Sequence, residues 1–280
     1  GEHICIIGRN RPHLYWSIIA AQNVGAIPTP LYQDSVAQEM IFPISHCSAK
    51  MAIVENQEQV DKLLEIKKDI TSLKNIIYLD PRGLRNYKKN NLYSLNDVFT
   101  LKNIENVSKL QTELKNRQSK QNLDTKSILL YTSGTTGRSK GVVLSNRNVI
   151  ESGKAGIVFD NINSDFSLIC YLPMAWVGDF AFSMGLGLQS GMCICCPESS
   201  ETLHDDMREI GPSYFFGPPR FFESLLTSVN LKIDDASSVK RKLFDYFMSI
   251  AKENGEKILE NKSVGLVNRI KYFFGELFIY

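Results

Sequence analysis

Short apolar runs alternate with longer amphipathic stretches through the first 80 residues, and this alternation constrains the fold more than any other feature. The stretch from Asn10 to Gly25 predicts a helix, with Asn10 as its cap, a proline in the first turn and the glycine at its end. Two more helices are expected over residues 36–46 and 57–68. Strands that alternate with helices at this spacing pair in parallel, so the pattern predicts an α/β fold with parallel-rich sheets flanked by helices. The expected strands are Ile4–Ile7, Ala26–Thr29, Met51–Val54 and Ile76–Leu79.

A polar stretch over residues 82–127 separates this pattern from a second one. Its basic side chains stand among Asn, Gln and Tyr, which is typical of an exposed helix and loop. An apolar strand expected at Ile128–Tyr131 ends it, so we place a subdomain boundary there, between residues 1–127 and residues 128–280. The strands expected in the second subdomain are Gly141–Leu144, Leu168–Leu172, Met192–Cys196 and Tyr214–Phe216. Two helices are expected over residues 178–189 and 235–260. Three more are expected, one capped by Ser145 and two that begin at Glu201 and Pro218.

Charge and composition exclude several classes of protein. With 32 basic and 30 acidic residues the net charge is +2, so we expect no nucleic-acid partner. The 43% of hydrophobic residues excludes intrinsic disorder. The six cysteines do not form the two C-x-x-C pairs of a zinc ribbon, which favours free thiols in the cytoplasm over a zinc site or a disulfide framework. No stretch of the sequence has the pattern of a membrane-spanning helix.

The sharpest motif runs from Tyr131 to Gly141 and reads Tyr-Thr-Ser-Gly-Thr-Thr-Gly-Arg-Ser-Lys-Gly, between two expected strands. Its glycines let the backbone approach an anion closely, and its hydroxyl groups can donate hydrogen bonds to phosphate oxygens. Arg138 and Lys140 add positive charge. The motif is not a Walker A loop, because Ser139 stands where that loop has glycine, and it is not G-x-G-x-x-G. It indicates a polyphosphate-binding loop, with a polar surface turn as the alternative.

Leu129–Lys140 resembles the signature of the adenylate-forming, or AMP-binding, superfamily, which includes acyl-CoA synthetases, peptide-synthetase adenylation domains and beetle luciferases. The resemblance implies an incomplete N-terminal domain of the adenylate-forming, luciferase-like fold, in which this loop holds the phosphates of ATP. It also implies catalytic roles for Thr132 and Lys140 and a weak Mg²⁺ contact for Thr132. The residues expected at the ATP phosphates are Tyr131, Thr132, Ser133, Gly134, Thr135, Thr136, Gly137 and Lys140.

Further segments resemble the long-chain acyl-CoA synthetase branch of that superfamily. They are the helix start Gly8–Trp16, the segment Gln57–Leu63, the segment Tyr171–Trp176 and the long helical pattern over 235–260. The resemblance places Trp176 at the border of the acyl pocket, where its flat apolar face would line the acyl chain; the alternative is a core tryptophan. Asp179 either faces this cleft or takes part in a salt bridge or a helix cap. The expected substrate-pocket residues are Trp176, Asp179, Gly217 and Pro218, although the last two could instead only start a helix.

The resemblance implies an ATP-dependent enzyme with two half-reactions. A long-chain fatty acid is activated to an acyl-adenylate, and CoA then accepts the acyl group, so ATP, Mg²⁺ and CoA are the expected cofactors and co-substrates. The superfamily's Tyr-Gly-x-Thr-Glu and Thr-Gly-Asp motifs and its C-terminal lid do not occur in this sequence. We therefore expect a piece of a longer protein that is inactive alone. A non-catalytic nucleotide-binding fragment and an amino-acid-type adenylation domain are alternatives, and a homodimer and peripheral membrane contact stay open.

Overall fold

The computed structural model describes residues 1–100, 107–132 and 139–279 of the chain. Its contacts divide the chain into two units, Gly1–Phe215 and Phe216–Tyr280, which are described separately. The boundary expected at residue 128 falls inside the first unit, and a division of that unit there stays a prediction.

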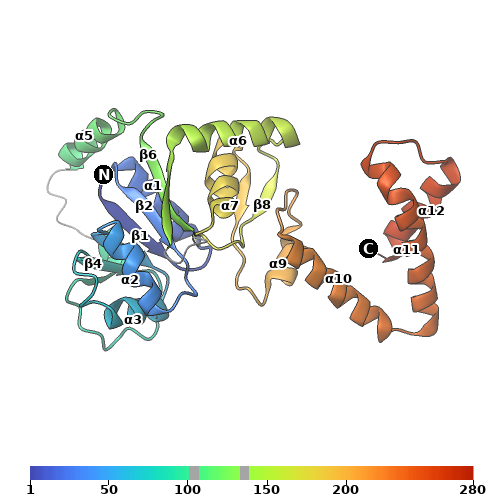
Figure 1. The fold of residues 1–280 in the computed structure, drawn as a ribbon, viewed down its shortest axis with the longest axis horizontal. Coiled ribbons are helices and arrows are strands. Elements are labelled where there is room, and N and C mark those ends of the chain that lie inside the picture. The colour runs from blue at the N-terminus through green and yellow to red at the C-terminus, as the bar shows by residue number, and fades with distance from the viewer. Residues whose placement is uncertain (101–106, 133–138, 280) are drawn as a thin grey trace. The chain divides into compact units, whose positions relative to one another are not determined.

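The first unit is built on a five-stranded sheet in which every neighbouring pair of strands is parallel (Figure 1). This arrangement confirms the predicted α/β class. The strands, in the spatial order β2-β1-β3-β4-β5, are β1 His3–Ile7, β2 Ile27–Leu31, β3 Met51–Val54, β4 Asn75–Tyr78 and β5 Leu92–Ser94. The helices that accompany them are α1 Pro12–Asn23, α2 Ala37–His46, α3 Gln57–Glu65, α4 Leu95–Phe99 and α5 Val107–Gln118.

Strand β1 shows how this sheet separates two cores. Successive side chains of a strand point to opposite faces. Cys5 and Ile7 belong to a buried cluster that includes residues of α2 and α3. Ile6 belongs to a second cluster with Leu14 and Ile18 of α1. The helices therefore cover both faces of the sheet, as the near-continuous apolar run of a parallel strand requires.

Smaller elements complete the first unit. The hairpin of β6 Lys126–Thr132 and β7 Lys140–Ser145 is antiparallel, whereas β8 Ser167–Ile169 and β9 Cys193–Cys195 pair in parallel. The strand expected at 214–216 is a single bridge between Leu168 and Tyr214. The helices are α6 Asn146–Asp160, α7 Val177–Phe180, the π-helix η1 Ala181–Gly187, α8 Leu188–Ser190 and α9 Leu203–Ile210.

Helix α6 begins where the sequence predicts. The side chain of Ser145 accepts a hydrogen bond from the Asn148 amide, and the Asn148 side chain accepts one from the Ser145 amide, which completes a capping box. Further along the helix, Gly153 permits a close approach to η1, because a Cβ there would lie 2.5 Å from the carbonyl oxygen of Gly185. The two helical segments therefore pack with almost no space between their backbones.

The second unit is helical. The pattern expected over 235–260 forms a helix that starts at Ser238, after a short break from the helix before it. A last helix, which the sequence analysis did not predict, packs on it. None of the helices in the described parts of the chain is both long and apolar enough to cross a membrane. The helices are α10 Pro219–Asp234, α11 Ser238–Leu259 and α12 Leu266–Ile279.

Candidate active site

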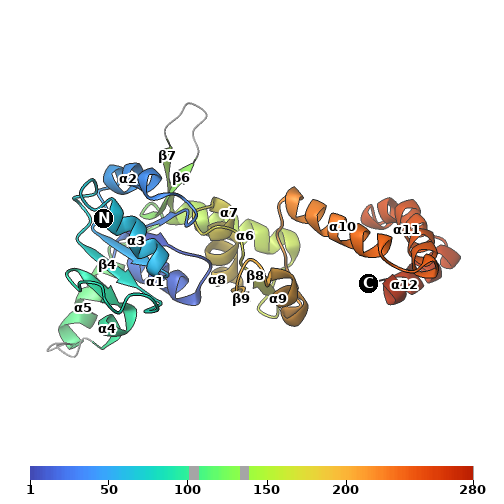
Figure 2. The same cartoon turned by 90° about the horizontal axis from the view of Figure 1, so that it is seen from below.

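The hairpin of β6 and β7 brings two predicted catalytic residues together. Thr132 and Lys140 are opposite each other in the strand register of β6 and β7. Figure 2 shows these two strands side by side. Both residues are exposed. A hydroxyl and an ammonium group on adjacent strands can contact one anionic ligand at the same time. The predicted phosphate ligands Ser133, Gly134, Thr135, Thr136 and Gly137 lie outside the described residues, so their contacts stay predictions.

Tyr131 anchors this hairpin to α2. Its hydroxyl donates to the carbonyl oxygen of Pro43 at 3.0 Å and lies 2.8 Å from Nδ1 of His46. Burial raises the pKa of the Tyr131 phenol, so the hydroxyl keeps its proton. The hydroxyl is engaged with α2, and the contact expected between Tyr131 and the ATP phosphates stays a prediction.

A cleft of about 860 Å³ lies beside the end of the hairpin. Its volume is in the range of small-molecule sites. Trp176 borders it with 49% of its surface exposed, which excludes the alternative of a core tryptophan. The structure therefore brings Thr132 and Trp176 to one cavity. The cleft is lined by Pro30, Leu31 and Tyr32 of β2 and the turn after it, by Ser35, by the α2 residues Gln38, Glu39, Met40, Ile41, Phe42, Pro43 and Ser45, and by Tyr131, Thr132, Ser139, Ala175 and Trp176.

Asp179, also expected in the substrate pocket, does not line this cleft. It is 4% exposed, and its carboxylate accepts hydrogen bonds from the Tyr15 hydroxyl at 2.8 and 2.9 Å and from Asn10 Nδ2 at 2.9 Å. Burial raises its pKa to about 7, and the two hydrogen bonds oppose that shift. The prediction that Asn10 caps α1 was wrong. The cap position is Arg11, which makes no side-chain cap bond, and the side-chain amide of Asn10 donates to Asp179 instead. Nothing in the sequence marked Asn10 or Tyr15 as partners of Asp179.

The remaining pocket candidates belong to the second unit. Pro218 is the cap residue of α10 and Gly217 precedes it, which fits the alternative that the two residues start a helix. Their place in a substrate pocket stays a prediction.

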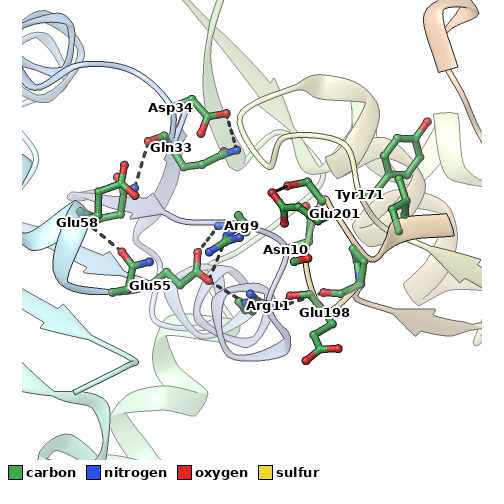
Figure 3. Close-up of a pocket in the computed structure, with 16 residues that line it drawn as sticks. Arg9, Asn10, Arg11, Gln33, Asp34, Glu55, Glu58, Tyr171, Glu198 and Glu201 are labelled. Atoms are coloured by element: carbon green, nitrogen blue, oxygen red, sulfur yellow. Dashed lines mark hydrogen bonds and ion pairs between the residues drawn. The ribbon is translucent and has the colours of Figure 1, made fainter. Parts of the chain in front are cut away.

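A second crevice, of about 340 Å³, lies at the carboxyl ends of β1, β2 and β3 (Figure 3). Glu55 accepts hydrogen bonds from the Arg9 amide at 2.7 Å and from Arg11 Nε at 2.9 Å. The Arg11 guanidinium also donates to the carbonyl oxygens of Pro197 at 3.1 Å and Glu198 at 2.9 Å. Arg11 therefore ties the loop after β9 to the end of β1. No motif in the sequence marked this crevice.

The predicted Mg²⁺ contact of Thr132 does not amount to a metal site on its own. Thr132 supplies one neutral oxygen, whereas Mg²⁺ in proteins takes carboxylates together with phosphate oxygens of a ligand. Within the described ranges, no three His, Cys, Asp or Glu side chains gather so that they could hold a metal ion. The chain's own described residues therefore do not fit a preformed Mg²⁺ site.

Comparison with known proteins identifies the family. Residues 1–260 match the AMP-binding enzyme family, so the chain belongs to that family. This membership agrees with the motif at the end of β6 and with the cleft beside it.

Relatives and solved structures show how much of such a protein the chain represents. It is 27% identical over 258 residues to the long-chain-fatty-acid–CoA ligase ACSBG1 of Rattus norvegicus, covering 89% of this chain and 35% of that protein. The match to the ligase ACSBG2 of Homo sapiens is 28% over 262 residues, 91% of this chain and 38% of that protein. The chain thus spans little more than a third of the length of these curated relatives.

Two solved structures share the fold. A luciferase-like enzyme from the nonluminescent mealworm Zophobas morio superposes with a TM-score of 0.63 at 17% identity, covering 79% of this chain and 48% of that one. ATP-bound MatB from Rhodopseudomonas palustris superposes with a TM-score of 0.58 at 19% identity, covering 81% of this chain and 41% of that one. These likenesses confirm the predicted luciferase-like fold class.

Proposed function

We propose that this chain supplies the phosphate-binding hairpin and the acyl cleft of an ATP-dependent long-chain fatty-acid–CoA ligase. The observation that carries the proposal is the single cleft that is bordered by both Thr132, at the end of the β6–β7 hairpin, and Trp176. A ligase of this kind has to hold a charged polyphosphate next to an apolar chain, and both polar and apolar residues line this cleft. The named relatives ACSBG1 and ACSBG2 support the same substrate class.

The proposed chemistry needs positioning and charge neutralisation more than a protein nucleophile. The fatty carboxylate attacks the α-phosphorus of ATP, which forms the acyl-adenylate and releases pyrophosphate. The thiol of CoA then attacks the acyl carbon and displaces AMP. In the first step the Lys140 ammonium and the Thr132 hydroxyl would stabilise the negative charge on the leaving pyrophosphate. Both groups stand at the hairpin end, where such a charge could reach them.

The apolar part of the cleft would hold the acyl chain. Ile41 and Phe42 of α2 and the ring of Trp176 supply apolar surface there. Each buried methylene contributes about 0.8 kcal/mol, roughly a fourfold preference per carbon. A chain that runs along this surface would therefore be favoured over a short one.

Pyrophosphate release by the complete enzyme, measured with octanoate and palmitate, tests the assignment of Trp176. We expect Trp176→Ala to lower the preference for palmitate at least tenfold. Trp16→Ala is the matched control, because Trp16 is 58% exposed on α1 and does not line the cleft. An unchanged preference in Trp176→Ala would remove the acyl assignment.

The hairpin is tested in the same assay. Loss of one preorganised charge-stabilising donor costs about 10²-fold in rate, so Lys140→Ala should lower kcat/KM for ATP by that order. Lys126→Ala is its control, because Lys126 is exposed at the other end of the same strand pair. Equal effects of the two substitutions would argue against a specific role of Lys140.

A further inference from the structure

Asp179 is a buried carboxyl group that the proposed reaction does not use. It lies in the first turn of α7, which begins directly after Trp176. Asn10 and Tyr15, its hydrogen-bond donors, come from β1's carboxyl side and from α1, 169 and 164 positions away in the sequence. All three residues are buried, with 4%, 6% and 3% exposure for Asp179, Asn10 and Tyr15. The contact therefore joins two distant parts of the first unit in a site closed to water.

Asn10 holds both ends of the segment that carries Trp176. Its Nδ2 donates to the carbonyl oxygen of Leu172 at 2.9 Å and to Asp179 Oδ1 at 2.9 Å. Residues 173–176 lie between these two acceptors, and Ala175 and Trp176 of that segment line the cleft. The same Nδ2 also donates to the Tyr15 hydroxyl at 2.7 Å, so its two hydrogens are shared among three acceptors. Asn10 therefore contacts the segment on both sides of the tryptophan.

A second bond fixes the helix that follows. The Ser183 hydroxyl donates to the main-chain oxygen of Asp179 at 2.6 Å, and Ser183 is fully buried within η1. The side chain of Asp179 therefore accepts a hydrogen bond from Tyr15 of α1, and its main-chain oxygen accepts one from Ser183 of η1. A π-helix is a rare conformation that often marks a functional site.

We propose that Asn10, Tyr15 and Asp179 form a clamp that positions Trp176 at the acyl end of the cleft, so that Asp179 acts as a positioning residue for acyl-chain selection. The proposal rests on the proposed function only in naming the acyl chain as the ligand of Trp176. The position of the tryptophan itself can be followed without any substrate.

The titratable groups around Asp179 allow a clean readout. Tyr15 of α1, Cys170 after β8 and Cys196 after β9 interact with its charge. Burial raises the pKa of Tyr15 and of Cys170 well above their ordinary values and that of Cys196 to about 12. A change near neutral pH in this cluster therefore belongs to Asp179, whose pKa is about 7.

Trp176 fluorescence tests the clamp. The chain has two tryptophans, so Trp16→Phe leaves Trp176 as the only emitter. In this background we expect the emission of the whole 280-residue chain to change in one step with a midpoint near pH 7. Asp179→Asn should abolish the step, because the amide does not titrate. Asp160→Asn, the same change at an exposed residue of α6, should leave it in place.

Tyr15→Phe gives a second, milder test if Asp179→Asn unfolds the chain. It removes a hydrogen bond to the carboxylate, so the midpoint should move up by about one pH unit. A step that persists in Asp179→Asn, an absent step in the parent, or a midpoint unmoved by Tyr15→Phe would overturn the clamp. If the step behaves as expected while Trp176→Ala leaves the palmitate preference unchanged, the clamp stands and the acyl assignment of the cleft fails.

Discussion

The burial of Asp179 predicts an unusual dependence of stability on pH, which replacement by asparagine would remove. The carboxyl group is 4% exposed, and its hydrogen-bond donors Tyr15 and Asn10 are both neutral. Burial accordingly raises its pKa from 3.8 to about 7. In the unfolded chain the same group is hydrated and ionises near the ordinary value.

The direction and size of the effect follow from proton linkage. Between about pH 4 and pH 7 the folded chain binds one more proton at Asp179 than the unfolded chain does, so the free energy of unfolding falls as pH rises. The pKa difference of about 3 units corresponds to about 4 kcal/mol over that whole window. Above pH 7 both states are ionised at this position, and the loss is complete. Asp179→Asn has no such proton, so it gains stability relative to the parent as pH rises.

Urea denaturation followed by circular dichroism can measure this difference. At pH 7 the folded group is half ionised, so from about pH 5 to about pH 7 the gap between Asp179→Asn and the parent should change by about 2 kcal/mol in favour of the variant. Asp160→Asn carries the same change of charge at an exposed site and should leave the gap constant. A gap for Asp179→Asn that stays constant within about 1 kcal/mol, or that moves the other way, would refute the reasoning from burial.

Three further predictions concern the helices, each measured by urea denaturation against the parent. Ser145→Ala removes the capping box of α6 and should cost about 1 kcal/mol. Gly153→Ala should cost about 1–3 kcal/mol, because the new Cβ would lie 2.1 Å from Gln189 Nε2 and 2.5 Å from the Gly185 carbonyl oxygen; a neutral result would show that α6 and η1 can separate. Gly255→Ala, in the interior of α11 with nothing within 4 Å of the new Cβ, should instead stabilise the second unit by about 0.5–1 kcal/mol.

The sequence predicted four of the five strands of the first sheet, because each of those four strands carries its own apolar signal. Run Ile4–Ile7 is apolar on both faces, which a strand covered on both sides requires, and the structure places β1 there. Strand β5 carries no such signal: its three residues, Leu92–Ser94, stand in a polar stretch and are fixed by pairing with β4. Helix α12 was also missed, because the sequence analysis assigned no element after residue 260.

The candidate site likewise has a part that neighbouring residues in the sequence predict and a part that depends on segments far apart in the sequence. A motif of consecutive residues such as the one after β6 could be recognised because glycine, hydroxyl and lysine positions are all close in sequence. Its place beside Trp176 depends on how β6, α2 and the 173–176 segment pack, and the sequence gives no distance between them. The pairing of Thr132 with Lys140 could be predicted from the sequence, because the two ends of a loop between two adjacent strands lie close together.

Asn10 shows why the buried part of the site could not be predicted. An asparagine two residues before the first proline of a helix has a local preference to cap that helix, worth about 1 kcal/mol. An ionised or polar group left without a partner in the interior costs about 1–3 kcal/mol or more. The hydrogen bond from Asn10 to Asp179 therefore stabilises the fold more than a helix cap by Asn10 would. The stronger requirement was visible in the sequence as a lone charge in an apolar stretch, but its partner stood 169 positions away. A lone carboxylate in an apolar stretch therefore predicts that a polar residue elsewhere in the sequence donates a hydrogen bond to it. Only the fold determines which residue that is.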